Sequence, residues 1–187
     1  MCSLVCRFLE AHVIAIANVS KNWAIGKQGK LLCTIPEDMQ RFRSLTMGNV
    51  VIMGNSTLKS LPGKLPLEGR FNIVLIGRDD SCAPESVNGS HEKKIPLVFA
   101  HSVEQALDFV SGFRDDDVFV VGGASIYKQF LPYCSECWLT ENSIDDPDAD
   151  AFFPDISNDA AWVEKSSTAM EHYGDIDYRF VEYERRK

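Results

Sequence analysis

Short apolar runs, each ending abruptly in turn-forming residues, constrain the fold of this chain more than any other feature of its sequence. They occupy residues 12–19, 49–53, 71–76, 96–99 and 118–121. Runs of this length without polar alternation are typical of strands that are buried on both faces. Helical patterns at 37–45, 103–110 and 126–131 alternate with them. The sequence therefore predicts an α/β fold in which helices cover both faces of a mostly parallel sheet.

The last third of the chain has a different pattern. No helical periodicity follows Pro132, and residues 136–141, 162–168 and 178–184 show the alternation that is typical of antiparallel strands. We therefore expect a mixed sheet with an antiparallel C-terminal strand. The polar segment 81–94 is expected to be a surface loop. The length of 187 residues fits a single domain that spans residues 1–187.

The formal charge of the chain excludes some classes of partner. With 19 Lys and Arg against 27 Asp and Glu the net charge is −8, so a broad basic face for nucleic acid is not expected. An anionic ligand would have to be bound by a few local groups, such as the start of a helix or a single basic side chain. No stretch reaches the roughly 18 apolar residues of a membrane span, and the N-terminus lacks the basic start of an export signal. We therefore expect a cytoplasmic protein without a membrane partner.

The six cysteines of the chain are expected to be free thiols. A core of this size needs no disulfide framework. Cys134 and Cys137 form a CxxC pair, but a zinc site needs further ligands at suitable spacing, and the sequence offers none. No metal site is predicted.

Glycines and hydroxyl side chains directly follow two of the apolar runs. Residues 54–57 (GNST) come after the second run and residues 122–125 (GGAS) after the fifth, each before a helical stretch. Ligands of open α/β sheets bind beyond the carboxyl ends of the strands, where glycine lets the backbone approach a phosphate and a helix start supplies amide donors. Either segment alone is better explained as a Ser/Thr helix cap with a glycine turn. Two such segments at neighbouring strand ends favour a pyrophosphate.

Other residues near strand ends allow two interpretations each. Arg78 and His101 follow the third and fourth runs, where a cation could hold a ribose phosphate and select NADP over NAD, or could simply be solvated. The chain contains no GxGxxG, which disfavours a standard Rossmann half. Residues 25–32 could form a flap that closes over a ligand, or a plain surface connection. Asp38 lies near the start of a helical pattern, and periodicity alone favours a cap or a partner of the helix dipole.

Several motifs, taken in order, resemble the dihydrofolate reductase family. They are IGKxG at 25–29, PEDMxxF at 36–42, VIMGxxT at 51–57, GRxN at 69–72, VGGASIY at 121–127 and FFPD at 152–155. The resemblance implies a three-layer α/β/α fold with a central mixed sheet of about eight strands, and an adenosine-binding subdomain at roughly 48–115. It implies NADPH-dependent reduction of 7,8-dihydrofolate to 5,6,7,8-tetrahydrofolate, with hydride transfer to pterin C6 and protonation at N5. It also implies a monomer that binds antifolates such as methotrexate.

The resemblance further assigns roles to single residues. Asp38, Thr140 and Tyr127 are implied to be catalytic, with Asp38 inside the pterin pocket, Thr140 supporting it and Tyr127 beside the nicotinamide. Arg70 is implied to pair bidentately with the glutamate carboxylate of folate. The other implied substrate contacts are Ile16, Met39, Phe42, Leu61, Leu67 and Val121. The implied cofactor contacts are Asn18, Ile25, Gly26, Gly54, Asn55, Ser56, Thr57, Arg78, His101, Val121, Gly122, Gly123, Ala124, Ser125, Ile126 and Tyr127. The bond between Gly122 and Gly123 is implied to be cis.

Some positions depart from the pattern of the family. Cys33 stands where a tryptophan is usual, Asn18 where a small apolar residue is usual, and Asn55 where a basic residue is expected. Without that basic charge we expect a weaker preference for NADPH over NADH. Two alternatives stay open, namely a reductase of pyrimidine intermediates with the same fold and a non-catalytic folate or nucleotide binder.

Overall fold

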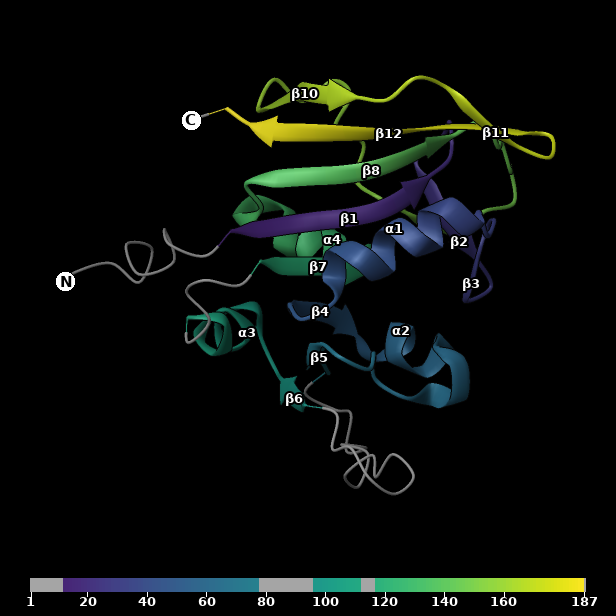
Figure 1. Ribbon diagram of the computed structural model, residues 1–187. Coiled ribbons are helices and arrows are strands. Elements are labelled where there is room, and N and C mark those ends of the chain that lie inside the picture. The colour runs from purple at the N-terminus through teal and green to yellow at the C-terminus, as the bar shows by residue number, and fades with distance from the viewer. Residues whose placement is uncertain (1–11, 78–95, 112–116, 187) are drawn as a thin grey trace.

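The computed structural model describes residues 12–77, 96–111 and 117–186, and its centre is a large mixed sheet (Figure 1). The parallel strands are β1 (Val13–Val19), β4 (Val50–Gly54), β5 (Phe71–Leu75), β6 (Leu97–Ala100), β7 (Val118–Gly122) and β8 (Glu136–Asn142). The C-terminal strands are β10 (Trp162–Ser167), β11 (Glu171–Tyr173) and β12 (Ile176–Arg185). Their order is β10-β12-β8-β1-β7-β4-β5-β6, with β11 paired to β12. Every apolar run of the sequence forms one of the parallel strands, as predicted.

The orientation of β8 differs from the sequence prediction. Residues 136–141 were expected to form an antiparallel strand, but β8 is parallel to β1, with Asn18 opposite Thr140. Helix α4 (Ala124–Phe130) and the 3-10 turn η3 (Leu131–Tyr133) carry the chain back between β7 and β8, and a helical crossover of this kind makes the next strand parallel. The prediction for the C-terminal strand is confirmed, because β12 runs antiparallel to β8.

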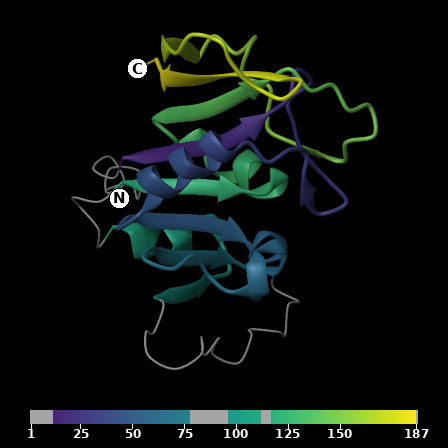
Figure 2. The ribbon, with the colours of Figure 1, turned by 45° about the vertical axis from the view of Figure 1, so that its right-hand side comes forward.

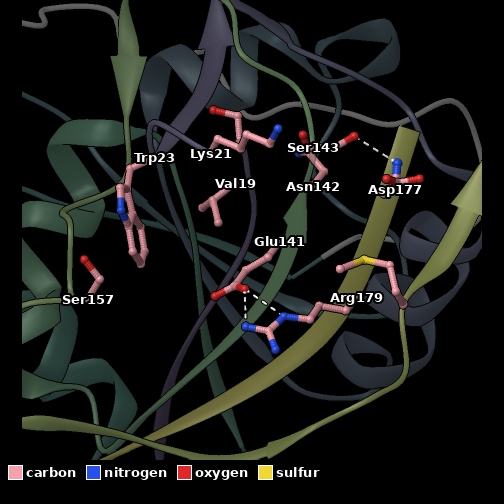
Figure 3. Close-up of a pocket in the computed structure, with 11 residues that line it drawn as sticks. Val19, Lys21, Trp23, Glu141, Asn142, Ser143, Ser157, Asp177 and Arg179 are labelled. Atoms are coloured by element: carbon pink, nitrogen blue, oxygen red, sulfur yellow. Dashed lines mark hydrogen bonds and ion pairs between the residues drawn. The ribbon is translucent and has the colours of Figure 1, made fainter. Parts of the chain in front are cut away.

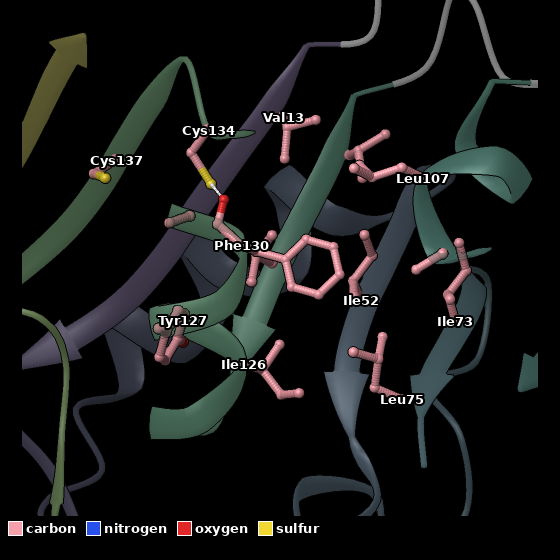
Figure 4. Close-up of a cluster of buried hydrophobic side chains, with 14 of the residues drawn as sticks. Val13, Ile52, Ile73, Leu75, Leu107, Ile126, Tyr127, Phe130, Cys134 and Cys137 are labelled. Carbon is pink, nitrogen blue, oxygen red and sulfur yellow. Dashed lines mark hydrogen bonds between the residues drawn. The ribbon is translucent and has the colours of Figure 1, made fainter. Parts of the chain in front are cut away.

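Helices cover both faces of the sheet, which confirms the three-layer arrangement (Figure 2). One face carries α1 (Pro36–Thr46) and α2 (Asn55–Ser60), the latter followed by the 3-10 turn η2 (Pro62–Lys64). The other face carries α3 (Val103–Val110) and α4. Figure 4 shows Phe130 and Ile126 of α4 directed toward Ile52 and Leu75 of the sheet. The alternation of strands and helices therefore buries two separate apolar layers, one on each face.

The segment expected to be a flap or a surface connection is a β-hairpin. Strand β2 (Ala24–Lys27) pairs antiparallel with β3 (Lys30–Leu31) on one side and with β9 (Ala151–Phe152) on the other. The turn between β2 and β3 places Gln28 at φ 50° and Gly29 at φ 74°, a left-handed geometry that glycine adopts without strain. This small sheet stands beside the carboxyl end of β1.

Other sequence expectations concern cysteines, metal ligands and membrane spans. Cys33, Cys134 and Cys137 are free thiols, and burial raises the pKa of Cys134 to about 12. Within residues 12–77, 96–111 and 117–186, no three His, Cys, Asp or Glu side chains are placed to share a metal ion. None of the described helices combines the length and apolar character that crossing a bilayer requires.

Candidate functional site

The carboxyl ends of β1, β7 and β4 meet at one edge of the sheet, because these strands are parallel neighbours. A cavity of about 280 Å³ lies at this edge, and we call it the glycine cleft. The predicted cofactor residues that line it are Asn18, Ile25, Gly26, Ser56, Thr57, Val121, Gly123, Ala124 and Tyr127. The cleft therefore brings together residues from the β2–β3 hairpin, from α2 and from the start of α4.

Both helices at the glycine cleft begin with glycine caps. Gly54 is the N-cap of α2 and Gly123 that of α4, and neither helix has a hydrogen bond from a capping side chain. The alternative explanation by Ser/Thr caps is therefore wrong for both segments. Amide groups at such helix starts are suited to an anion, because they add donors and the positive end of the helix dipole.

Two glycines of these segments are required by close packing. A Cβ atom at Gly122 would lie 2.6 Å from the ring of Tyr127, and one at Gly54 would lie 3.0 Å from Ile126. Gly122 also has φ 96°, and the bond from Gly122 to Gly123 is cis, as the resemblance implied. The cleft is therefore supported by close packing among residues that do not line it, namely Gly54, Gly122 and Ile126.

The remaining predicted cofactor residues lie near the cleft or outside the described part of the chain. Asn55 is buried at the first position of α2. Ser125 is exposed on α4, where its hydroxyl accepts a hydrogen bond from Gln129 at 3.1 Å. His101 is exposed after β6, and its backbone N–H donates to Oε1 of Gln105. Arg78 lies outside the described residues.

Asp38 is turned away from the helix cap that periodicity favoured. The N-cap of α1 is Ile35 and has no side-chain hydrogen bond, while Pro36 takes the first helical position. The Asp38 carboxylate instead receives a hydrogen bond from Oγ1 of Thr140 at 2.5 Å and another from Nδ2 of Asn18 at 3.0 Å. Thr140 is 1% exposed on β8 and Asn18 lies opposite it on β1. The sheet thus holds one carboxylate by both oxygens at the edge where the glycine cleft opens.

An apolar wall extends from Asp38 between α1, α2 and the sheet. Ile16 belongs to the buried cluster on this face, and the partly buried residues packed against that cluster include Phe42, Leu61, Leu67 and Val121. The structure therefore brings together five of the six predicted apolar substrate contacts. The sixth, Met39, is 43% exposed on α1. A flat, partly apolar molecule would find a surface of this kind beside a fixed carboxylate.

Arg70 is a buried cation at the far end of α1. Its side chain donates to Oγ1 of Thr46 at 3.1 Å, to the carbonyl of Glu68 at 2.7 Å and to the carbonyl of Arg43 at 3.4 Å. Burial, and then the neighbouring charge of Arg43, lower the pKa of Arg70. A guanidinium fixed in this way retains donors for an anion, since it carries five N–H groups.

Tyr127 is fixed through its hydroxyl group. Its hydroxyl donates to the carbonyl of Ile16 at 2.7 Å, and burial raises its pKa strongly, with Asp38 contributing. The hydroxyl proton is therefore already engaged by the main chain. Tyr127 presents its ring to the glycine cleft, and the role of this residue in catalysis stays a prediction.

Sequence reasoning missed several residues of the site. Ala17, Lys27, Gly29, Lys30, Leu31, Ser60 and Ala151 also line the glycine cleft. Lys27 and Gly29 belong to the IGKxG motif, from which a flap or a surface connection was expected but no contact of these single residues. Ala151 gave none, because β9 is only two residues long.

A larger cavity of about 560 Å³ is lined by Trp23, Met170, the carboxyl end of β8 and the start of β12 (Figure 3). Its arginine and its glutamate are paired with each other, since Arg179 donates to Glu141 at 2.8 Å and at 3.0 Å. The other oxygen of Glu141 accepts from Tyr183 at 2.6 Å. The glycine cleft, in contrast, lies at the glycine-capped starts of α2 and α4, and the Asp38 carboxylate lies at its edge next to the apolar wall. The smaller cavity is therefore the candidate site.

Comparison with known proteins points to the same site. A profile described as "Dihydrofolate reductase" matches residues 12–185. A dihydrofolate reductase of Neisseria meningitidis is 34% identical over 173 residues, which cover 91% of this chain and 96% of that protein. One of Mycobacterium leprae is 34% identical over 170 residues, covering 89% and 93%. A solved dihydrofolate reductase of Enterococcus faecalis, complexed with NADP(H) and RAB-propyl, superposes with a TM-score of 0.74 at 22% identity and covers 95% of this chain and 98% of its own.

Proposed function

The chain belongs to the dihydrofolate reductase family, and on this premise we propose that Asp38 and the glycine cleft carry out the NADPH-dependent reduction of 7,8-dihydrofolate to 5,6,7,8-tetrahydrofolate. One observation carries the assignment to these residues. At the edge of the cleft, the carboxylate of Asp38 is held by a side-chain donor on each oxygen, Thr140 on one and Asn18, which itself lines the cleft, on the other. It lies between a wall suited to a pterin and a cleft suited to a dinucleotide.

We propose that Asp38 binds and orients the pterin. Thr140 and Asn18 each occupy one side of the carboxylate, so each oxygen keeps a lone pair for the substrate. The amino group and the neighbouring ring nitrogen of a pterin are paired donors that fit such a carboxylate. By accepting from them, Asp38 favours the protonated form of the substrate, whose N5 must receive a proton in the reaction.

The residues of the glycine cleft fit the cofactor. Gly123 caps α4 without a side chain, and a Cβ at this position would already approach Oγ1 of Thr57 at 3.5 Å. Ser56 and Thr57 add hydroxyl donors beside that helix start. When bound there, NADPH supplies the hydride for pterin C6. The hairpin of β2 and β3 covers the cleft and limits the access of water.

We also propose the wider setting of the enzyme. Residues 48–115 would form the adenosine-binding part, supported by the position of α2 and β4–β6 together at one end of the sheet (Figure 2). The chain would act as a monomer in the cytoplasm, and the free thiols of Cys33, Cys134 and Cys137 support the reducing compartment.

The test follows the loss of NADPH absorbance after dihydrofolate is added, with and without methotrexate. We expect turnover that methotrexate blocks. Asp38→Asn should lose most of this turnover near neutral pH and less of it in acid, where the substrate is protonated without help. The matched control is Asp108→Asn on the exposed face of α3, which should behave as the unmodified chain. Tight binding of dihydrofolate without turnover, or full activity of Asp38→Asn at neutral pH, would contradict the proposal.

A further inference from the structure

The carboxylate of Asp38 is the end of a hydrogen-bonded chain that begins outside the glycine cleft. The backbone N–H of Ile144 donates to Oδ1 of Asn142 at 2.9 Å. Nδ2 of Asn142 donates to Oδ1 of Asn18 at 2.6 Å, and Nδ2 of Asn18 donates to Oδ2 of Asp38 at 3.0 Å. Asn142 lies on the wall of the larger cavity (Figure 3) and is two residues from Thr140 on β8, which lies opposite Asn18, so this chain of amides runs along one face of the sheet to Asp38.

The direction of both amide groups is fixed by the two ends of the chain. A side-chain amide has one acceptor oxygen and one donor nitrogen. Because the N–H of Ile144 can only donate, Asn142 must turn its oxygen toward Ile144 and its nitrogen toward Asn18. Asn18 must then turn its nitrogen toward Asp38, whose ionised carboxylate can only accept. Each hydrogen bond in such a chain polarises the next.

Burial makes this arrangement costly to change. Asn142 is 6% exposed, so its amide has little water to replace a lost partner. The thiol of Cys33 donates a weak second hydrogen bond to the same oxygen, with its Sγ 4.0 Å from Oδ1 of Asn18. Among the described residues, only Thr140 and Asn18 donate hydrogen bonds to the Asp38 carboxylate. The plane of that carboxylate is therefore set by one donor on each oxygen.

We propose that Asn18, oriented by Asn142, is a positioning residue that fixes the plane of the Asp38 carboxylate for the paired N–H donors of the substrate. This inference rests on the proposed function of Asp38. A pair of parallel hydrogen bonds needs both oxygens in the plane of the two donors, and a small rotation weakens both at once. Asn18 thus acts on the substrate side of the site, in addition to lining the cleft predicted for the cofactor.

The first experiment compares Asn18→Ala, Asn142→Ala and the double variant, with dihydrofolate and NADPH varied separately. A hydrogen bond to a charged group corresponds to about a 10- to 100-fold effect, so we expect kcat/KM for dihydrofolate to fall by at least about tenfold in Asn18→Ala. Asn142→Ala should give a smaller loss and leave the KM for NADPH unchanged. Because Asn142 acts through Asn18, the double variant should be no worse than Asn18→Ala. Losses that multiply would overturn the inference.

A second variant tests the direction of the chain. In Asn142→Asp the side chain can still accept from Ile144 but cannot donate to Asn18, so Asn18 would turn its nitrogen away from Asp38 and face it with an oxygen. We expect Asn142→Asp to lower kcat/KM for dihydrofolate more than Asn142→Ala does, although it is closer in shape to the natural residue. Equal losses in the two variants, or losses that follow only their urea unfolding midpoints, would show a purely structural role.

The pH profile of kcat/KM is the remaining readout. The other titratable groups whose charge is coupled to Asp38 are Cys33, Arg41, Tyr127 and Tyr178, and the substitutions leave all of them in place. We expect the profile of Asn18→Ala to shift relative to that of the unmodified chain, and an unchanged profile counts against the inference. Methotrexate binding, followed by fluorescence without turnover, separates the two proposals. If the unmodified chain turns over dihydrofolate but Asn18→Ala binds methotrexate equally well, the proposed function stands and the inference fails.

Discussion

Arg70 is a cation whose orientation is fixed before any ligand binds. Three hydrogen bonds to Thr46, Glu68 and Arg43 hold its guanidinium at the end of α1. Its fork can offer two parallel donors to a carboxylate, which a lysine ammonium cannot do. Arg70 binds Thr46 of α1, the helix that carries Phe42 of the apolar wall, and this supports the assignment to the glutamate carboxylate of the substrate.

We predict that Arg70→Lys weakens the binding of folates but not that of a pterin without the glutamate. The loss should be about tenfold or more for the folate, because one charge-assisted hydrogen bond and its geometry are removed. Titration of both ligands by fluorescence measures the difference. The matched control is Arg43→Lys, which keeps a charge on the exposed side of α1. An equal loss for both ligands would show that Arg70 supports the fold and not the carboxylate.

The contacts of single residues were the least predictable part of the site. Periodicity placed Asp38 near a helix start and favoured a cap, and only the resemblance assigned it to the pterin. Its partners Asn18 and Thr140 lie 20 and 102 positions away in the chain. Such a pairing depends on the register between β1 and β8, which no local pattern encodes. The same reason explains why Asn18 was predicted only as a cofactor contact.

At the scale of elements, the β2–β3 hairpin is held by the acidic segment 145–150. Nζ of Lys27 donates to Asp146 at 3.1 Å and to Asp148 at 3.2 Å, and the backbone N–H of Gln28 donates to Asp150 at 2.9 Å. The hydrogen bond to Asp146 is the main cause that raises the pKa of Lys27. These contacts tie two segments that are far apart in sequence to the wall of the glycine cleft.

We predict that Lys27→Ala affects ligand binding more than global stability. Exposed ion pairs contribute little to stability, so the urea unfolding midpoint should change little, whereas the Kd for NADPH should rise by up to about fivefold as the hairpin loosens. The matched control is Lys165→Ala, which removes an exposed pair with Glu136 far from the cleft. A change in Kd that is equal in both variants would contradict the role of the hairpin.

A second prediction at this scale concerns Glu136, which joins β8 to β10. Burial acts to raise its pKa, but hydrogen bonds from Trp138 at 2.7 Å and Lys165 at 3.0 Å outweigh burial, so the pKa lies below its ordinary value of 4.5. The folded protein therefore binds this proton less readily than the unfolded chain. The stabilisation is present above the ordinary pKa and is lost as pH falls through the lower one.

Glu136→Gln should therefore reduce the amount by which the free energy of unfolding falls in acid. The measurement is the free energy of unfolding in urea at neutral pH and at successive values below about pH 5, where the carboxylate of the unfolded chain begins to be protonated. The unmodified chain should lose more stability over this range than Glu136→Gln. The exposed Glu68→Gln serves as the control and should keep the full slope. Parallel slopes for all three proteins would refute the assignment.

Helices and strands were predicted well where a pattern in their own residues indicates them. The parallel strands at 12–19, 49–53 and 118–121 are continuous apolar runs, and β4 is buried at every position. The hairpin β2–β3 and strand β9 were not predicted, because four or fewer residues carry too little pattern. The predicted orientation of β8 was wrong, because the alternation of apolar residues shows only which face of a strand is buried. Whether β8 runs parallel to β1 depends on the crossover through α4.

At the scale of the whole molecule, an acidic chain must attract anionic ligands. The net charge of −8 gives no general attraction for NADPH or a folate. Local positive charge is instead gathered around the site. Arg43 and Arg70 lie at one end of α1, and Lys30 lines the glycine cleft, where the neighbouring Lys27 is already paired with Asp146 and Asp148. The negative charges of Asp146 and Asp148, in segment 145–150, are paired with Lys27 of the hairpin. These carboxylates are therefore not free to repel an anionic ligand in the cleft.

This arrangement predicts how far the cofactor stabilises the fold. A ligand at about 100 times its Kd adds about 2.7 kcal/mol to the free energy of unfolding. For a chain of this size about 1 kcal/mol corresponds to roughly 2–4 °C in Tm, so saturating NADPH should raise Tm by roughly 5–11 °C. NADH at the same concentration should give a smaller rise, because it lacks the phosphate that Ser56 and Thr57 can bind. Because Asn55 stands where a basic residue is expected, we expect the Tm with NADPH to exceed that with NADH by only a few degrees.

The ionic strength of the solution separates this electrostatic difference from other causes. Exposed charges are screened beyond about 10 Å at 0.1 M salt and beyond about 3 Å at 1 M, so the advantage of NADPH over NADH should shrink as salt is added. Ser56→Ala should shrink it as well, whereas Ser111→Ala at the far end of α3 should leave it unchanged. Equal Tm shifts with NADPH and NADH at low salt would mean that no residue of the glycine cleft recognises the 2′-phosphate. The local positive charge would then act only on the pyrophosphate and the folate carboxylates.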